Sequence, residues 1–217
     1  MRVKKLIHFI VGLFLMGQFP VEASKQVCKE AISKQESQKG IPRDLLKAIA
    51  SVESGISPWA VNAHGRAHIF PSKQGAVTYI RQLLEEGSGN FSIGCMQLHY
   101  ASHRRHFTSI EDMLEPEKNI AHAAKLIKNL ERRHGSMDRA IKLYHSPTPA
   151  YHNRYKNRVY SMWAKFQKTN KGDESLSKIA LKDPHSQKPL SNAQKRSTKI
   201  KFGIGAASLV KDRHRKT

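Results

Sequence analysis

The stretch "LLKAIASVESG", Leu45 to Gly55, has the spacing of an amphipathic helix that ends on a carboxylate. Leu46, Ile49 and Glu53 lie three, four and seven residues apart, so they share one side of the helix. A carboxylate on a half-buried helical face loses hydration when charged, so its pKa rises and it can hold a proton near neutral pH. The pattern by itself allows two interpretations of Glu53: a general acid, or a solvated residue at a helix end.

Helical patterns surround this stretch, interrupted by one small β element. Residues 59–70 predict two short strands around a turn at His64-Gly65, and residues 91–100 form a short apolar, strand-like segment. Helices are expected over residues 24–39, 41–54, 72–87, 109–135, 136–144 and 148–166. This order indicates a predominantly helical α+β domain, with a cleft where the β element meets the helices.

The first 23 residues have the pattern of a secretory signal. Positive charges at Arg2, Lys4 and Lys5 precede an apolar run over residues 6–16, and residues 21–23 offer a small-residue cleavage site. The apolar run is shorter than the roughly 20 residues that a membrane-spanning helix needs. The pattern predicts an exported protein; the alternative is an N-terminal anchor that is not cleaved.

Export gives the two cysteines of the chain a specific meaning. In an oxidising compartment Cys28 and Cys95 are expected to pair, which would tie the first mature helix to the segment "IGCMQ". The alternative is two separate buried thiols. No metal site is expected, because two cysteines are a poor ligand set and none of the 12 histidines has a carboxylate or cysteine at good ligand spacing.

Basic residues are concentrated in the last part of the chain. The formal net charge is +21, and residues 168–217 carry 13 Lys/Arg against four Asp/Glu. The apolar pattern also ends at Gln167, so the chain divides into a signal (1–23), a folded domain (24–166) and a mostly disordered basic tail (167–217).

A basic exported protein suits a polyanionic partner: a cell-wall polymer with peptide carboxylates, an anionic membrane surface or nucleic acid. Nucleic acid is not expected, because the chain combines an export signal with no matching nucleic-acid-binding motif. Membrane contact is expected only through an uncleaved signal or through the basic tail.

Three short blocks occur in a specific order: "VESG" ending at Gly55, "GCMQLH" beginning at Gly94, and "AIKLYHS" containing Tyr144. Over residues 41–163 the chain thereby resembles the lytic transglycosylases of the goose-type-lysozyme-like superfamily. The helix "EPEKNIAHAAKLIKNL" is also similar to the family helix that precedes the tyrosine. Two departures are visible: His145 follows Tyr144 where the family commonly has Asn, and the second block ends in Leu-His where the family has Ile-Asn.

The resemblance implies a lysozyme-like fold with the β element beside an active-site cleft. Glu53 would be the catalytic residue, without any cofactor, and Ser54, Met96, Gln97 and Tyr144 would bind the substrate. No second acid occurs in these blocks. One acid is enough if the substrate itself supplies the other reacting groups. The 2-acetamido oxygen of a muramic sugar would stabilise the cation at C1, and its C6 hydroxyl would close a 1,6-anhydro ring.

The resemblance therefore implies a periplasmic enzyme that cleaves peptidoglycan glycan strands between N-acetylmuramic acid and N-acetylglucosamine. One alternative is a muramidase-type hydrolase on the same fold, with water as the nucleophile. Another is a non-catalytic basic protein for wall binding or secretion-system assembly. The sequence leaves open whether such an enzyme serves general wall turnover or a secretion, conjugation or flagellar apparatus.

Overall fold

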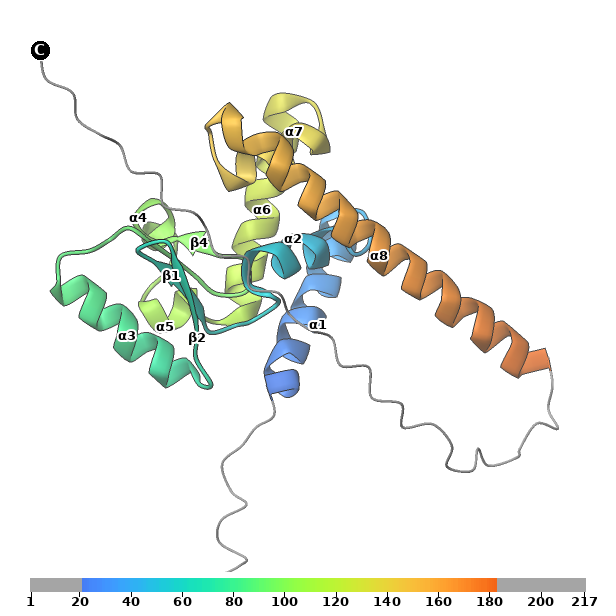
Figure 1. Cartoon of the computed structure of the whole chain (residues 1–217), viewed down its shortest axis with the longest axis horizontal. Helices are drawn as coiled ribbons and strands as arrows, with labels where there is room; N and C mark the ends of the chain where they lie inside the picture. Colours follow the sequence, from blue (N-terminus) through green and yellow to red (C-terminus); the bar gives the residue numbers. More distant parts are fainter. Residues whose placement is uncertain (1–20, 183–217) are drawn as a thin grey trace, which may run out of the picture. The chain divides into compact units, whose positions relative to one another are not determined.

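The computed structural model describes residues 21–182, which include a four-stranded antiparallel sheet surrounded by helices (Figure 1). Most of the predicted signal and the tail beyond Lys182 lie outside this range. The long helices are α1 (Val21–Lys39), α2 (Leu45–Ser54), α3 (Lys73–Glu85), α6 (Pro116–His134), α7 (Met137–His145) and α8 (Pro149–Lys182), and the short ones are α4 (Tyr100–His103), η2 (Arg104–His106) and α5 (Ile110–Met113). Within residues 21–182, none of the helices is both long and apolar enough to cross a bilayer. The predicted helical α+β class is confirmed.

The sheet has the strand order β2-β1-β3-β4. Strands β1 (Ala60–Ala63) and β2 (Arg66–Ile69) form the predicted hairpin, and both turn residues, His64 and Gly65, have positive φ angles of 51° and 71°. Two positive φ angles define the tight turn that suits the twist of a two-residue hairpin. The segment expected as one strand is two, β3 (Phe91–Ile93) and β4 (Leu98–His99), paired across a turn that begins at Gly94.

Helix α2, which carries Glu53, begins at Leu45 and not at Pro42 as predicted. The carboxylate of Glu36 on α1 accepts hydrogen bonds from the backbone N–H groups of Asp44 (2.8 Å), Leu46 (2.7 Å) and Lys47 (3.3 Å). The N–H groups of a first helical turn lack partners within the helix, so a carboxylate there stabilises the helix at that position. A long-range contact therefore sets this boundary.

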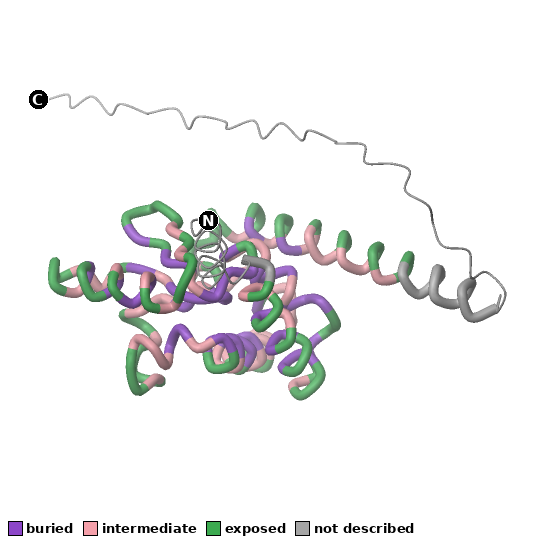
Figure 2. The backbone as a smooth tube through the Cα atoms, turned by 90° about the horizontal axis from the view of Figure 1, so that it is seen from below, coloured by how far each residue is buried: buried purple, intermediate pink, exposed green. Residues whose placement is uncertain are grey.

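Helix α2 lies in the core, and α6 packs against both α1 and α7. The predicted apolar positions Leu46 and Ile49 are fully buried, and buried segments gather where the helices and the sheet meet (Figure 2). Cys28 on α1 and Cys95 in the turn before β4 form a disulfide bond, with a Cα–Cα distance of 6.4 Å. The predicted pairing is confirmed.

Helix α8 continues past Phe166, where the apolar pattern predicted the end of the folded domain. Gln167 donates from its side-chain amide to the carbonyl of Arg43 (2.9 Å), and Asn170 donates to the carboxylate of Asp44 (2.6 Å). These contacts are polar, so apolar periodicity gave no sign of them. Helix α8 therefore runs past the domain boundary predicted at residue 166 and makes polar contacts beyond it.

Candidate active site

Glu53 lies in the last turn of α2, two residues before the capping residue Gly55 (φ 64°). Its Oε1 accepts a hydrogen bond of 2.6 Å from the hydroxyl of Tyr155 on α8. Burial raises the pKa of Glu53 to about 7, and the Tyr155 hydrogen bond and the charge of Arg158 only partly oppose this effect. Glu53 can therefore donate a proton near neutral pH and take one back.

Glu53 faces a hollow of about 270 Å³ between the sheet and the helices. The hollow is lined by Glu53, Asn62, Ser92, Gln97, Leu98, His99, His103, Leu126, Tyr144 and His145. Within this lining, all of it in the described part of the chain, Glu53 is the one carboxylic acid. The cleft predicted beside the β element is present, and it holds a single carboxyl group.

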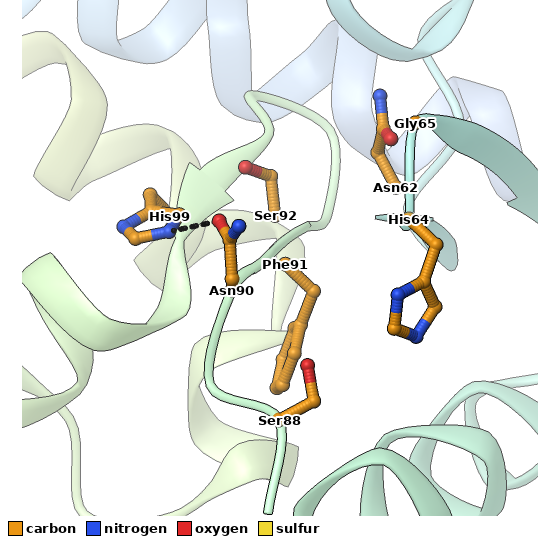
Figure 3. A pocket seen from close by; sticks show the side chains of 8 residues that line it. All are labelled: Asn62, His64, Gly65, Ser88, Asn90, Phe91, Ser92 and His99. Carbon is orange, nitrogen blue, oxygen red and sulfur yellow. Dashed lines mark hydrogen bonds between the residues drawn. The ribbon is translucent and has the colours of Figure 1, made fainter. Parts of the chain in front are cut away.

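A second hollow of about 380 Å³ shares Asn62, Ser92 and His99 with the first, so the two adjoin, and we refer to them together as the cleft. In Figure 3 the side chains of Asn90 and Ser92 lie between His99 on one side and His64 on the other. His99 Nε2 and Asn90 Oδ1 are 3.2 Å apart and hydrogen-bonded. Amide, hydroxyl and imidazole groups along this wall suit a ligand rich in hydroxyl and amide groups.

A model of the transglycosylase SLT domain family matches residues 30–165. The chain belongs to this family. Comparisons with curated proteins and with solved structures found no match. The SLT domain implies an enzyme with lytic transglycosylase activity on peptidoglycan, and together with the disulfide bond it suggests a location outside the cytoplasm.

Two of the predicted substrate-binding residues of the SLT domain are buried behind the cleft. Ser54 is 8% exposed, and its hydroxyl donates to the Cys95 carbonyl (2.7 Å) while accepting from the Ser57 N–H (3.0 Å). Met96 is fully buried and its carbonyl oxygen accepts a hydrogen bond from Tyr144 (2.6 Å). Neither side chain is among those that line this hollow, and the bonds of both residues hold its wall in place. Their role in substrate binding stays a prediction.

The other two predicted residues, Gln97 and Tyr144, do line the cleft. The Gln97 amide nitrogen donates to the carbonyls of Ala60 (3.1 Å) and Gly94 (3.0 Å). Because these bonds use both amide hydrogens, a substrate donor would meet the Gln97 Oε1 atom. The Tyr144 hydroxyl donates to the Met96 carbonyl, and its role in substrate binding stays a prediction.

Tyr155 of α8 donates the hydrogen bond that Glu53 accepts, a role that the sequence did not indicate. Tyr155 lies in the helix expected over residues 148–166, and its side chain is buried, at 3% exposed. The aromatic ring also stacks on His145, with ring centres 4.2 Å apart and planes 3° from parallel. His145 is the residue that departs from the family block, and it holds one face of the ring that orients Glu53.

Asn119 of α6 is a second structural residue that the sequence analysis did not single out. It is fully buried, its Oδ1 accepts from the Met96 N–H (2.9 Å), and its Nδ2 donates to the carbonyls of Ile93 (3.1 Å) and Met113 (3.0 Å). A Cβ atom at Gly94 would lie 2.4 Å from Asn119 Nδ2. Asn119 therefore locks the turn of the second block, and Gly94 leaves room for it.

Four histidines, His99, His103, His106 and His122, lie beside the cleft. His103 and His122 are linked by a ring-nitrogen hydrogen bond of 3.1 Å, and burial together with the neighbouring histidines lowers the pKa of His103 to about 4. Across residues 21–182, no cluster of three or more His, Cys, Asp or Glu side chains has an arrangement that would hold a metal ion. At neutral pH, His103 is an uncharged hydrogen-bonding group in the cleft wall.

Proposed function

We propose that the chain is a peptidoglycan lytic transglycosylase in which Glu53 is the one catalytic acid and base. The observation that carries this proposal is the cleft with a single carboxyl group, whose pKa is raised to about 7 and which bonds to Tyr155. A glycosidase that uses water ordinarily needs two carboxylates on either side of the bond. A cleft with one acid favours a substrate-assisted reaction.

In the first step, Glu53 donates its proton to the glycosidic oxygen between N-acetylmuramic acid and N-acetylglucosamine, and the C1–O bond breaks. The 2-acetamido oxygen of the muramic sugar stabilises the positive charge at C1. In the second step, the Glu53 carboxylate takes the proton of the C6 hydroxyl, and that oxygen bonds to C1. The product is a 1,6-anhydro sugar, no water is consumed, and Glu53 ends protonated as it began.

The surroundings of Glu53 suit a group that serves as acid and then as base. A proton-transfer group works best when its pKa lies near the working pH, and burial brings Glu53 to about 7. The Tyr155 hydroxyl donates a hydrogen bond to the Glu53 carboxylate, which stabilises the charged form that acts as the base in the second step. Gln97 Oε1 and the polar wall of Asn62 and Ser92 would orient the sugar.

Product analysis tests this function. Wild-type protein incubated with purified sacculi should release muropeptides that end in 1,6-anhydro-muramic acid, and Glu53→Gln should lower the rate at least about 10²-fold while circular dichroism stays unchanged. Products with reducing ends, heavier by one water, would assign the protein as a muramidase-type hydrolase. Binding to sacculi without any product would assign it as a wall-binding or assembly factor.

The proposed location is the periplasm. The signal pattern of residues 1–23 and the disulfide bond of Cys28 and Cys95 support export. Cell fractionation should recover the protein in the periplasmic extract, and recovery in the cytoplasm would contradict the proposal. A role in opening the wall for a secretion, conjugation or flagellar apparatus is compatible with this location.

A further inference from the structure

The short helix α4 and the turn η2 separate the catalytic cleft from another hollow. His99 and His103, four residues apart, line the cleft. Residues on the other side line a hollow of about 730 Å³, formed by Tyr100, Ala101, Arg104, Arg105, Phe107, Thr108, Ser109, Ile110, Glu111 and Met113. We call it the arginine hollow. The helical period thus directs neighbouring residues into two different cavities.

The arginine hollow carries an excess of positive charge. Arg104 and Arg105 are exposed, and among the side chains of residues 23–172 no carboxylate lies within ion-pair distance of either guanidinium group. Glu111, the one acid in the lining, is paired with Arg81 at 2.7 Å. An anionic ligand would therefore meet two available guanidinium groups and a carboxylate whose charge is already balanced.

The hollow lies directly behind the cleft. The ring of Tyr100 stacks on the ring of Phe91, with centres 4.7 Å apart, and Phe91 lines the cleft beside His64 and Asn90 (Figure 3). The Arg104 guanidinium group lies 5.9 Å from the centre of the Tyr100 ring. One pair of stacked rings thus separates the arginine hollow from the cleft.

We propose that the arginine hollow binds the carboxylate-bearing peptide that branches from the muramic sugars of peptidoglycan. This inference rests on the proposed function, which places the glycan in the cleft. An extended peptide of four residues spans about 13 Å, enough to pass the Phe91–Tyr100 pair. Guanidinium groups form paired, charge-assisted hydrogen bonds with carboxylates. The rings of Tyr100 and Phe107, which line the hollow, offer apolar surface to the peptide.

The test compares glycan chains that carry stem peptides with the same chains after an amidase has removed them. Binding is measured in a Glu53→Gln background, so that turnover does not disturb the equilibrium. Arg104→Gln combined with Arg105→Gln should weaken binding of peptide-bearing chains about tenfold. The same pair should leave binding of peptide-free chains unchanged. Arg132→Gln with Arg133→Gln, at the end of α6, removes equal charge and should change neither affinity.

An equal loss on both substrates, or no loss, would overturn the inference. Arg104→Lys with Arg105→Lys keeps the charge but not the paired geometry, and it should bind peptide-bearing chains with intermediate affinity. This variant gives the answer if the glutamine pair fails to fold. Failure of the proposed function is separately visible, because wild-type protein would then release no anhydro products from peptide-free chains.

Discussion

Glu53 holds its proton to a higher pH than a solvated glutamate, and this has a consequence for stability. Below about pH 4.5 both folded and unfolded chains carry the proton, so burial of the carboxyl group has no electrostatic cost. Between about pH 4.5 and 7 the unfolded chain releases the proton while the folded chain keeps it, so the free energy of unfolding falls. Above about pH 7 the loss is constant, on the order of 3 kcal/mol.

Glu53→Gln should therefore stabilise the protein at neutral pH while it removes activity. The amide keeps an oxygen that can accept the Tyr155 hydrogen bond, and it cannot ionise. We expect a higher melting temperature for Glu53→Gln than for wild type at pH 8, and a difference close to zero at pH 4. A wild-type protein that is the more stable of the two at pH 8 would contradict the raised pKa.

Tyr155→Phe should change the pH dependence of the reaction. The Tyr155 hydrogen bond favours the charged carboxylate, so its removal raises the pKa of Glu53 above about 7. The fall of kcat/KM on the alkaline side should move to higher pH. The maximal rate should drop, because the carboxylate form that accepts the C6 proton becomes less stable. Tyr151→Phe, an exposed tyrosine on the same helix, serves as the control and should leave the profile unchanged.

The sequence could single out Glu53 as the candidate acid because its position in an apolar stripe is a local property of one helix. The identity of its partner is not local, since Tyr155 follows 102 residues later in a different helix. Tyr144 and Tyr155 are both aromatic residues in helical patterns. Only the packing of α7 and α8 decides which hydroxyl reaches the carboxylate.

At the scale of elements, Asn119 connects α6 to the turn between β3 and β4. Asn119→Ala would leave a buried N–H and two buried carbonyl groups without partners, and each such group costs about 1–3 kcal/mol. We expect chemical denaturation to show a loss of about 3 kcal/mol or more. Asn129→Ala, on the same helix, should change stability by less than about 0.5 kcal/mol, because its hydrogen bond with Arg132 is exposed to solvent. Similar losses for the two variants would rule out this role.

The elements themselves could be predicted wherever a side chain caps its own helix. Ser72 and Ser136 accept hydrogen bonds from N–H groups three residues later, and both helices begin where the sequence placed them. The start of α2 could not be predicted in this way, because its cap is Glu36 from another helix. The turn at Gly94 also escaped prediction, since it depends on Asn119.

At the scale of the whole molecule, two distant contacts hold α2 and its carboxylate in place. The disulfide bond closes a loop over a sequence separation of 67 residues, which corresponds to roughly 4 kcal/mol on the chain-entropy account. Cys95 also connects to α2, because its carbonyl accepts a hydrogen bond from the Ser54 hydroxyl. Fixing α1 therefore helps to fix the residue next to Glu53.

The other distant contact comes from α8, which makes the position of a truncation decisive. Cutting after Lys182 removes nine Lys/Arg and two Asp/Glu but none of the contacts to α2. We expect this variant to cleave short soluble glycans at the wild-type rate. Its binding to sacculi should weaken, and the difference from wild type should shrink as salt is added.

Cutting after Phe166 also removes Gln167 and Asn170, which bond to Arg43 and Asp44 just before α2. Because Gln167 and Asn170 hold the start of the helix that carries Glu53, we expect their loss to lower the melting temperature and to slow turnover of the same short glycans. The two truncations together separate adhesion from catalysis. If the cut after Phe166 left melting temperature and turnover unchanged, the folded domain would end at residue 166, as the apolar pattern alone predicts. If the cut after Lys182 abolished turnover, the basic tail would belong to the catalytic machinery.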